Sequence, residues 1–483
     1  MTTADLAGLL AKYDPGGFFC EMFGHGPGPA PGREALVERL DRFTIRDLKR
    51  RAQYAERELY NLGITFTVYT EKDQIDRILP FDVIPRVLSA AEWDVVERGV
   101  VQRVAALNAL IWDVYHDQKI IKDGVIPAEL ILGSKHFRPE MQGIDVPFRN
   151  YCHVCGIDLV RDDEGVFRVL EDNARAPSGV SYVVENRHLM QRAFPDLMHS
   201  AAVRPVSNYG QRLGEALAEM APPEVTDPQV VLLTPGVYNS AYFEHIFLAR
   251  EMGVPLVEGR DLVVEDDRVY MKTIGGLSPG HVIYRRINDE FLDPEVFQPD
   301  SVLGAKGLMR AYRKGNVAIA NGVGTGFADD KAVYAYMPRV IQYFLGEDAI
   351  LPNVDTHLCR ETDGLRYTLD HLSELVVKPV GESGGYGITI GPRASKAELK
   401  VCRDRLKADP TNYISQPMVR LSVSPTLVAR GVEPRHVDLR PFAVTGRETW
   451  VLPGGLSRVA LKRGSMIVNS SQGGGSKDTW VLG

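Results

Sequence analysis

Apolar residues recur at helical spacing along several stretches of the chain. The longest stretch, 90–115, reads AAEWDVVERGVVQRVAALNALIWDVY and predicts one or two helices that pack on a core and expose their charged residues. Similar patterns predict helical segments at about 33–62, at about 180–193, after Asp330, and at 395–408. Helices are therefore expected in both halves of the chain.

Alternating and β-branched residues predict the strands. After Tyr151 the sequence reads YCHVCGIDLV, then RDDEG, then VFRVLEDN, which is typical of a β-hairpin with its turn at 162–165. Further strands are predicted at 64–69, at ELVVKPV, YGITIG and YISQPMV, and through the glycine-containing stretch after His436.

A second pattern, strand, loop, helix and strand, covers 229–258. It indicates a βαβ unit and a parallel sheet, and the following hairpin and strand extend it to a small open α/β domain at about 228–325. Ligands of such sheets bind beyond the carboxyl ends of the strands. Residues expected there are the loop 234–240 with Asn239, and Arg285, Arg286 and Asn288.

Composition limits the classes of function. The 483 residues are 44% hydrophobic and 25% charged, which suits a globular protein of several domains. A net charge of −7 argues against broad binding to nucleic acid or an anionic membrane, although a local basic pocket remains open. The first residues lack a signal-peptide pattern, no apolar run would span a bilayer, and five cysteines do not suggest a disulfide framework. We therefore expect a cytoplasmic protein.

Candidate phosphate-binding residues lie in VVKPVGESGGYGI. Lys378 ends an apolar strand, and the glycine-rich segment that follows includes Ser383, Gly384, Gly385 and Gly387. Small residues let backbone N–H groups approach phosphate oxygens, and the lysine adds a positive charge. The spacing fits neither a Walker A motif nor a dinucleotide fingerprint. Taken alone, the segment is equally consistent with a simple β-turn.

Candidate metal ligands lie on the predicted hairpin. Glu171 and Asn173 share one strand face, and Asp158 on the adjacent strand is close enough to converge with them. Carboxylate and amide oxygens suit Mg²⁺, which binds a few protein oxygens together with phosphates and water. A salt-bridged acidic hairpin would explain any one of these residues but not their joint spacing.

These two stretches together resemble the ATP-grasp superfamily, which includes D-alanine–D-alanine ligase, glutathione synthetase and biotin carboxylase. Members usually carry the lysine and glycine-rich loop before the metal residues, whereas this chain has the reverse order and so resembles the circularly permuted branch. The segments TPGVYNSAYFEH, DDKAVYAY, VVKPV, HVDLRPF and VNSSQGGGSKDTWVL match that branch, and the resemblance covers essentially the whole chain. It implies an α/β (α+β ATP-grasp) fold with ATP and Mg²⁺ as cofactors.

The resemblance also implies a division of the chain. We expect an N-terminal helical region at 1–147, a metal-binding part of the ATP-grasp domain at 148–205, an α/β substrate domain at 206–325, a nucleotide subdomain with the glycine-rich loop at 326–415, and the hinge with the remaining sheet at 416–483.

Roles carry over from the family residue by residue. ATP is expected to bind Lys331, Lys378, the glycine-rich loop, Lys462 and an adenine hinge formed by Gln416, Pro417, Met418 and Val419. Mg²⁺ is expected to bind Asp158, Glu171 and Asn173. The substrates are expected to bind Arg175, Ser178, Asn239 and Arg285. In one respect the chain departs from some family ligases, which carry an arginine two residues before the first metal aspartate. Gly156 stands there instead, so Arg440, Arg458 or Arg286 is expected to supply the catalytic cation. Asp438 is either a polar residue of the site or a satisfied strand residue.

The reaction implied is activation of a carboxylate by ATP to an acyl phosphate, followed by attack of an amine. Its expected partners are small-molecule or peptide carboxylates and amines, with no nucleic acid and no membrane, and homo-oligomerisation stays open. Two alternatives remain: an ATP-dependent phosphotransferase and a non-catalytic nucleotide-binding protein. The joint presence of the metal set and both lysines disfavours the last.

Overall fold

The structure is a computed structural model that describes residues 8–61, 63, 65–69, 74–78, 80–381, 387–465, 468 and 474–483. Its helices are α1 (Glu34–Asp41), α2 (Ile45–Asn61), α3 (Ala90–Tyr115), α4 (Lys119–Lys122), α5 (Ala128–Leu132), α6 (Val180–Ala193), α7 (Pro195–Ser200), α8 (Tyr209–Ala218), α9 (Tyr242–Met252), α10 (Leu308–Arg313), α11 (Lys331–Leu345), α12 (Thr362–Asp370) and α13 (Lys396–Ala408).

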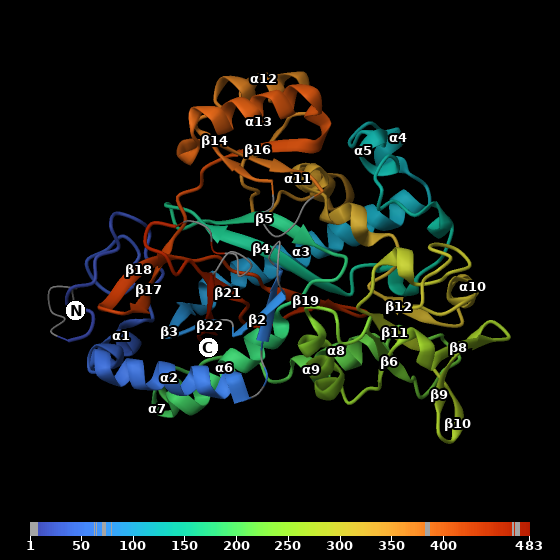
Figure 1. Cartoon of the computed structure of the whole chain (residues 1–483), viewed down its shortest axis with the longest axis horizontal. Coiled ribbons are helices and arrows are strands. Elements are labelled where there is room, and N and C mark those ends of the chain that lie inside the picture. Colours follow the sequence, from blue (N-terminus) through green and yellow to red (C-terminus); the bar gives the residue numbers. More distant parts are fainter. Residues whose placement is uncertain are drawn as a thin grey trace.

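A four-stranded antiparallel sheet occupies the centre of the molecule (Figure 1). Its order is β20 (Thr449–Val451), β19 (Phe442–Thr445), β4 (Val154–Arg161) and β5 (Phe167–Asn173). The predicted hairpin is therefore confirmed, and C-terminal strands extend its sheet. Helix α3 covers 90–115 as a single helix, where one or two helices were predicted. It packs on this sheet and begins with a capping box in which Ser89 and Glu92 satisfy each other's backbone N–H groups.

The strands around Lys378 form a separate lobe above the central sheet (Figure 1). The lobe contains an antiparallel sheet ordered β13 (His357–Leu358), β16 (Tyr413–Pro417), β14 (Leu375–Pro379) and β15 (Thr389–Ile390). Helices α12 and α13 cover one face of it, where Val377, Cys402 and Leu406 form a small core of their own. The opposite face, which carries Lys378, is turned towards the central hairpin.

A parallel sheet forms the predicted α/β domain. Its order is β12 (Ala318–Ala320), β11 (Val282–Arg285), β6 (Val230–Leu233) and β7 (Leu256–Val257), with α9 connecting β6 to β7 as expected for a βαβ unit. The predicted hairpin beside it is a three-stranded ribbon of β8 (Leu262–Glu265), β9 (Arg268–Thr273) and β10 (Gly276–Pro279). The order reverses between β6 and β11, where such sheets bind ligands.

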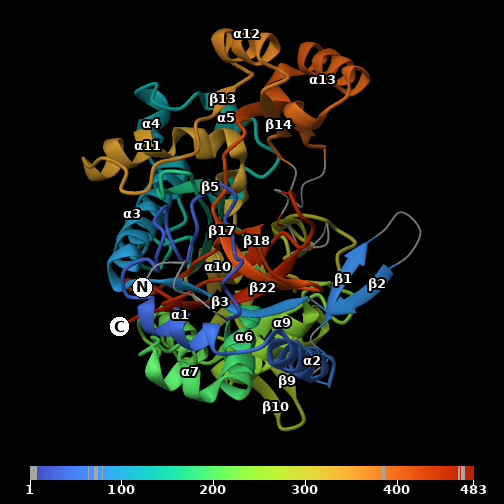
Figure 2. The same ribbon diagram turned by 90° about the vertical axis from the view of Figure 1, so that its left-hand side faces the viewer.

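The N-terminal region contains more than helices. β3 (Phe81–Leu88), which the helical expectation did not include, is buried throughout and pairs in parallel with β22 (Gly475–Val481). The pairing shifts register near Pro85, which cannot donate a ladder hydrogen bond. β21 (Ser457–Val459) completes this sheet, and β17 (Val423–Val428) pairs with β18 (Gly431–His436). The strand predicted at 64–69 is β1 (Thr65–Tyr69), which pairs with β2 (Gln74–Ile78) in a hairpin that projects from the body (Figure 2).

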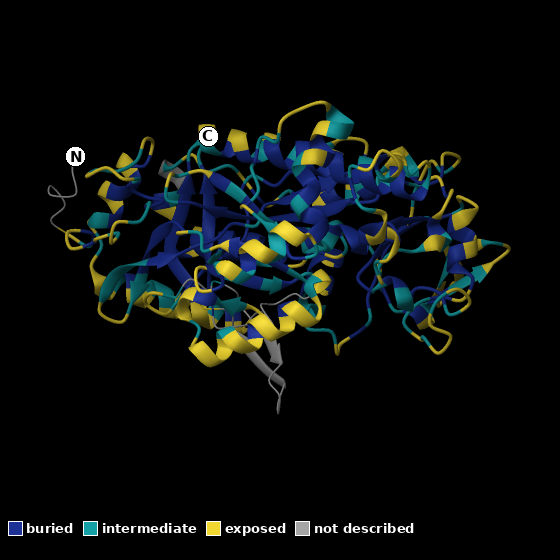
Figure 3. Ribbon diagram, turned by 90° about the horizontal axis from the view of Figure 1, so that it is seen from above, coloured by how far each residue is buried: buried dark blue, intermediate teal, exposed yellow. Residues whose placement is uncertain are grey.

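Burial follows these sheets. Figure 3 shows buried residues along the strands and exposed residues on the outer faces of the helices. The five cysteines are free and buried, so Cys152 and Cys155 are core residues beside the hairpin. No helix in the described part of the chain is long and apolar enough to cross a membrane.

Candidate active site

The metal-ligand candidates lie where the hairpin pattern predicted. In the antiparallel register Asp158 is opposite Glu171, and Gly156 is opposite Asn173. The turn is fixed by Asp162, whose carboxylate accepts hydrogen bonds from the backbone N–H groups of Glu164 (3.0 Å) and Val166 (2.9 Å). Local chemistry therefore sets the register that brings Asp158 next to Glu171.

Asp158 is bound by two arginines from distant parts of the chain. Arg440 donates from Nε to one carboxylate oxygen and from Nη2 to the other at 2.7 Å, and Arg458 Nη2 donates to the second oxygen at 2.7 Å. The side chain of Asp158 is only 1% exposed. Burial alone would raise the pKa of Asp158, but the two guanidinium groups outweigh it and lower the pKa to about 2. Asp158 is therefore a fully paired anion.

Arg458 is held in turn by Asp438. Its Nε donates to Asp438 Oδ2 at 2.8 Å, and its backbone N–H donates to Oδ1 at 3.0 Å. Burial opposes the charge on Arg458, but Asp438 and Asp158 raise its pKa above the ordinary arginine value. The sequence left two roles open for Asp438, and it has both: its carboxylate is fully hydrogen-bonded, and it directly supports the site.

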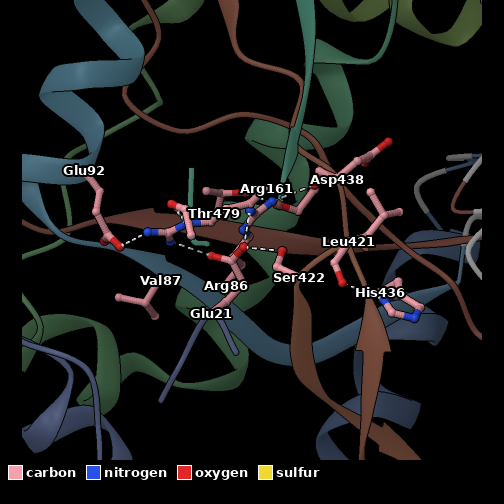
Figure 4. A network of polar contacts seen from close by, with 12 residues as sticks. Glu21, Arg86, Val87, Glu92, Arg161, Leu421, Ser422, His436, Asp438 and Thr479 are labelled. Carbon is pink, nitrogen blue, oxygen red and sulfur yellow. Dashed lines mark hydrogen bonds and ion pairs between the residues drawn. The ribbon is translucent and has the colours of Figure 1, made fainter. Parts of the chain in front are cut away.

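A buried ionic network ties Asp438 to the N-terminal segment (Figure 4). Arg86 donates to the backbone carbonyl of Asp438 at 2.7 Å and to Glu21 at 2.6 Å, and Glu21 also pairs with Arg161 at 3.2 Å. Burial would raise the pKa of Glu21, but Arg86 and Arg161 lower it to about 2. Residues near the start of the chain therefore support the strand segment that carries Arg458.

Arg440 fills the space beside Gly156. A Cβ atom at Gly156 would lie 3.3 Å from Arg440 Cδ and 3.2 Å from Pro177 Cβ, both tighter than ordinary contact. The glycine therefore leaves room for the stem of an arginine that comes from another segment. Of the cations proposed from the sequence, Arg440 is the one that occupies the volume next to position 156.

Glu171 lies between the arginine pair and two lysines. Lys331 Nζ is 3.6 Å from Glu171 Oε2, and Arg440 Nη2 is 4.0 Å from Oε1. Lys378 donates to Gln416 Oε1 at 2.6 Å. Burial lowers the pKa of Lys378 to about 8, with Glu171 opposing and Lys331 reinforcing that shift. Residues that are more than 200 positions apart thus share one electrostatic environment.

Gln416 supports Lys378 with its side chain as well as lying where the adenine hinge was predicted. Its amide oxygen accepts from Lys378, and its amide nitrogen donates to Thr356 Oγ1 at 2.9 Å. Pro417 ends β16, and Val419 packs near Val160 beyond it. Contact of Gln416, Pro417, Met418 and Val419 with a base stays a prediction.

One cavity of about 320 Å³ joins the hairpin to the α/β domain. Its lining includes seven of the residues that the sequence assigned to the site: Glu171, Asn173, Arg175, Ser178, Asn239, Arg286 and Lys331. Asn288 and His245 line it from the carboxyl-end side of the parallel sheet. Hydrogen-bond donors, two types of cation and a carboxylate therefore face the same space, as in a polar small-molecule site.

Arg285 and Arg286 differ from the free substrate cations expected. Arg285 is 1% exposed, and its guanidinium binds Asp289 at 2.6 Å and the backbone carbonyls of Asn321 and Ile287 at 2.8 and 2.7 Å. It is absent from the cavity lining described above. Arg286 does line the cavity, but its guanidinium donates to Glu244 at 3.0 Å and to the Pro177 carbonyl at 2.8 Å. Both arginines therefore brace the fold.

Glu244 explains why Arg286 is held there. Its other carboxylate oxygen accepts from the Gly179 N–H at 2.7 Å and from the Ser181 hydroxyl at 2.9 Å, at the start of α6. The loop with Arg175 and Ser178 is thereby fixed between the hairpin and the α/β domain.

Three predicted phosphate-loop residues, Ser383, Gly384 and Gly385, lie outside the described residues. Gly387 has a φ of 71°, a left-handed conformation that glycine adopts without strain. Lys462 is exposed in a turn, and no described contact connects it to the cavity.

The oxygen donors fit Mg²⁺, but fewer protein side chains are available as ligands than the sequence predicted. No cluster of three or more His, Cys, Asp or Glu residues suited to a metal occurs in the described ranges. Both oxygens of Asp158 accept from guanidinium groups, whereas Glu171 and Asn173 face the cavity. One carboxylate and one amide, completed by phosphate oxygens and water, suffice for Mg²⁺. Direct ligation is therefore expected from Glu171 and Asn173, with Asp158 behind them.

Asp329 was missed by the sequence reading. It precedes Lys331 by two residues, and its carboxylate accepts from the backbone N–H groups of Ala174 (2.6 Å) and Arg175 (3.2 Å). Burial raises the pKa of Asp329 to about 6 against the opposing effect of Arg175. The available signal was the acidic pair beside the phosphate lysine in DDKAVY.

Comparison with known proteins agrees with the family suggested by the motifs. Residues 85–460 match the family described as circularly permuted ATP-grasp type 2. An uncharacterized protein of Synechocystis sp. is 50% identical over 475 residues, covering 98% of both chains, and one of Mycobacterium tuberculosis is 52% identical over 468 residues, covering 96% of this chain and 84% of its own.

Two further matches are more distant. A Frankia alni protein named "Putative glutamate--cysteine ligase 2-3" is 42% identical over 479 residues, and this chain spans 98% of itself but only 54% of that relative. A solved structure, a glutathione synthetase-like effector from Globodera pallida in its apo form, superposes with a TM-score of 0.57 at 11% identity, covering 90% of this chain and 96% of the effector. At that identity the superposition shows a shared fold alone.

Proposed function

The chain belongs to the circularly permuted ATP-grasp type 2 family, and we propose that it is an ATP- and Mg²⁺-dependent ligase that joins a carboxylate to an amine. The acid would be activated by ATP to an acyl phosphate, with ADP released, and the amine would displace phosphate to form an amide or peptide bond.

One observation carries the proposal. Glu171, Lys331 and Lys378 come from separate segments of the chain but form one electrostatic cluster, and Glu171 and Lys331 line a polar cavity. The two ammonium groups suit phosphate oxygens, and Glu171 with Asn173 suits the cation that accompanies them. Mg²⁺ would supply charge neutralisation at the transferred phosphoryl group. The protein's part is positioning and electrostatic stabilisation, which is the main contribution to phosphoryl transfer generally.

Arg440 is the best-placed cation for the negative charge that develops on the acyl oxygen as the amine attacks. Its stem fills the space next to Gly156, its guanidinium reaches Asp158, and it lies 4.0 Å from Glu171. Arg458 stands behind it with both partners buried. We propose Arg440 as the catalytic arginine and Arg458 as its support.

The acid and amine stay open. The name of the Frankia relative includes glutamate and cysteine, but about half of that protein lies outside the match, so its name does not assign substrates to this chain. The cavity lining from both domains, with Arg175 and Ser178 on one side and Asn239 on the other, suits polar substrates.

The test is a product analysis with purified full-length protein, Mg²⁺, ATP, and pools of amino acids and short peptides, with and without hydroxylamine. A ligase gives ADP, phosphate and a trapped hydroxamate. AMP and pyrophosphate would contradict the acyl-phosphate route, and a stable phosphorylated product would indicate a phosphotransferase. The Glu171→Ala variant should remain folded and lose turnover, whereas wild-type turnover in that variant would remove the metal assignment.

A further inference from the structure

Asp329 is a carboxylate of this cavity to which neither phosphate nor metal binding gives a task. We propose that Asp329 holds the amino group of the amine substrate and takes its proton as the amide bond forms. This inference rests on the ligase function proposed above and assigns one more residue to it.

The position of Asp329 follows from the end of the metal strand. Asp329 is the last residue of the short helix Thr325–Asp329, and its Oδ1 accepts from the N–H groups of Ala174 and Arg175. These two residues directly follow Asn173. The carboxylate is therefore fixed at the end of β5, beside the part of the cavity where an activated carboxyl group would meet its nucleophile.

The second oxygen of Asp329 has hydrogen-bonding capacity left. Its contact with Arg175 Nε is 3.6 Å, too long for a hydrogen bond, and the side chain is 26% exposed towards the cavity. Asp158 and Glu244 differ: both oxygens of Asp158 accept from arginines, and both oxygens of Glu244 are occupied. Within the described part of the chain, Asp329 is thus a fixed carboxylate with one oxygen available to an ammonium group.

The surrounding charges suit a group that gains and loses a proton. Burial raises the pKa of Asp329 to about 6, Arg175 and the two N–H groups counteract this, and Glu171 adds to it. Across the cavity wall, burial and Arg175 lower the pKa of His136, so its imidazole is neutral near pH 7 and does not compete as a cation. Lys331, the other nearby cation, lies against Glu171. A carboxylate that titrates near neutrality is well suited to general base catalysis.

The ammonium group of the amine first passes one proton to Asp329, which frees the nitrogen lone pair. The lone pair attacks the carbonyl carbon of the acyl phosphate, and a C–N bond forms while the C–O bond to phosphorus breaks. Phosphate leaves with that electron pair and takes up the second proton from nitrogen. Asp329 releases its proton to water after the product departs.

The discriminating variant is Asp329→Asn, because asparagine keeps the oxygen that accepts from Ala174 and Arg175 but cannot hold an ammonium group or take its proton. Wild type and variant would be compared with Mg²⁺, ATP and pooled amino acids in two reactions: amide formation, followed by mass spectrometry, and hydroxamate formation with hydroxylamine at pH 7. Hydroxylamine is largely uncharged at that pH, so it needs neither a carboxylate to hold an ammonium group nor removal of a proton before it attacks. We expect amide formation to fall about 100-fold, as for loss of a general base, while hydroxamate formation stays close to wild type.

Asp330→Asn is the matched control. Asp330 is the next residue, but its carboxylate caps α11 by accepting from the Ala332 N–H at 2.7 Å, which asparagine can also do. Both reactions should be unchanged in this variant. Wild-type amide formation in Asp329→Asn would overturn the inference, and so would an equal loss of amide and hydroxamate, because Asp329 would then act on activation or folding. Absence of hydroxamate with the wild-type protein would instead refute the ligase function itself.

Discussion

Asp158 and Asp329 are aspartates of one site, but Asp158 is buried and Asp329 is partly exposed, and their surroundings differ. Asp158 belongs to a closed side, formed with Asp438, Arg440 and Arg458, in which every carboxylate is paired with a guanidinium group. Asp329 belongs to an open side, formed with Glu171, Arg175 and Lys331, in which the ion pairs are 3.6 Å long and face the cavity. The pKa falls to about 2 for Asp158 and rises to about 6 for Asp329.

This difference shows that charged residues have two separate roles in the site. On the closed side the paired carboxylates hold the architecture in place and are unavailable to ligands, whereas Arg440 also reaches to 4.0 Å from Glu171. The carboxylates of Glu171 and Asp329 on the open side form long ion pairs of 3.6 Å, which leaves them capacity for substrates. A site that binds small charged molecules needs both kinds of charge, and the following experiments test whether the division is real.

The largest expected effect is on stability and comes from Arg458→Met. The substitution leaves Asp438 without its cation and Asp158 with one cation, and both carboxylates are buried. Removing one partner of a buried ion pair typically costs about 3–5 kcal/mol. Urea unfolding would measure this loss. Arg175→Met on the open side is the control and should cost less than about 1 kcal/mol, since its ion pair is long and partly exposed. Equal losses would remove the distinction between the two sides.

Lys378→Met tests the open side through ligand binding. Loss of a charge directed at phosphate should weaken ATP binding or slow transfer by about 1.5–3 kcal/mol. Stability should change little, because the lysine is already disfavoured by burial, as its lowered pKa shows. ATP titration and steady-state kinetics would measure the effect. Lys400→Met, at an exposed position on α13 of the same lobe, should behave as wild type.

The pH dependence of stability should differ for the two aspartates. The folded pKa of Asp329, about 6, lies above its unfolded value of 3.8, so ionisation penalises the folded state, and stability falls as the pH rises through 6. Asp329→Asn should therefore be more stable than wild type by about 1–3 kcal/mol at pH 8 and no more stable near pH 3. Denaturation profiles at several pH values would show this.

For Asp158 the sign is opposite. Its folded pKa of about 2 lies below 3.8, so its contribution to stability is present above pH 4 and is lost as the pH falls towards 2. A stability difference between Asp329→Asn and wild type that did not grow from pH 3 to pH 8 would contradict the raised pKa of Asp329.

The smallest effect is expected from Gly156→Ala. The added methyl group would press on Arg440 and Pro177 at 3.3 and 3.2 Å, while alanine in a strand gains some stability from reduced chain entropy. The two terms should nearly cancel, within about 1 kcal/mol. Turnover should fall because Arg440 is displaced, and hydroxamate formation would report it. Gly26→Ala, where the nearest atom would be 3.8 Å away, is the control; unchanged turnover in Gly156→Ala would argue against Arg440 as the catalytic arginine.

Local sequence determined a large part of the fold. The hairpin, the capped helices α3 and α13, and the βαβ unit appear where periodicity and turn residues placed them. Strand β3 was missed because its residues are buried on both faces and include Pro85, so neither alternation nor a regular ladder marks it. A parallel partner almost 400 residues away has no local signature.

The site divides in the same way. Sequence by itself placed Asp158, Glu171 and Asn173 together, because a two-residue period and a tight turn fix neighbours on a hairpin. It also singled out Lys378, whose charge at a strand end is a local feature, whereas Lys331 was assigned through the family resemblance. Only the tertiary structure decided which charged groups are already paired within the protein. Arg440 and Arg458 bind Asp158 across 282 and 300 residues, and Arg285 donates to backbone carbonyls. Asp329 keeps one oxygen without a hydrogen bond among the described residues. Pairing of charges depends on distances between segments that the chain brings together only by folding, and no pattern along the sequence records those distances.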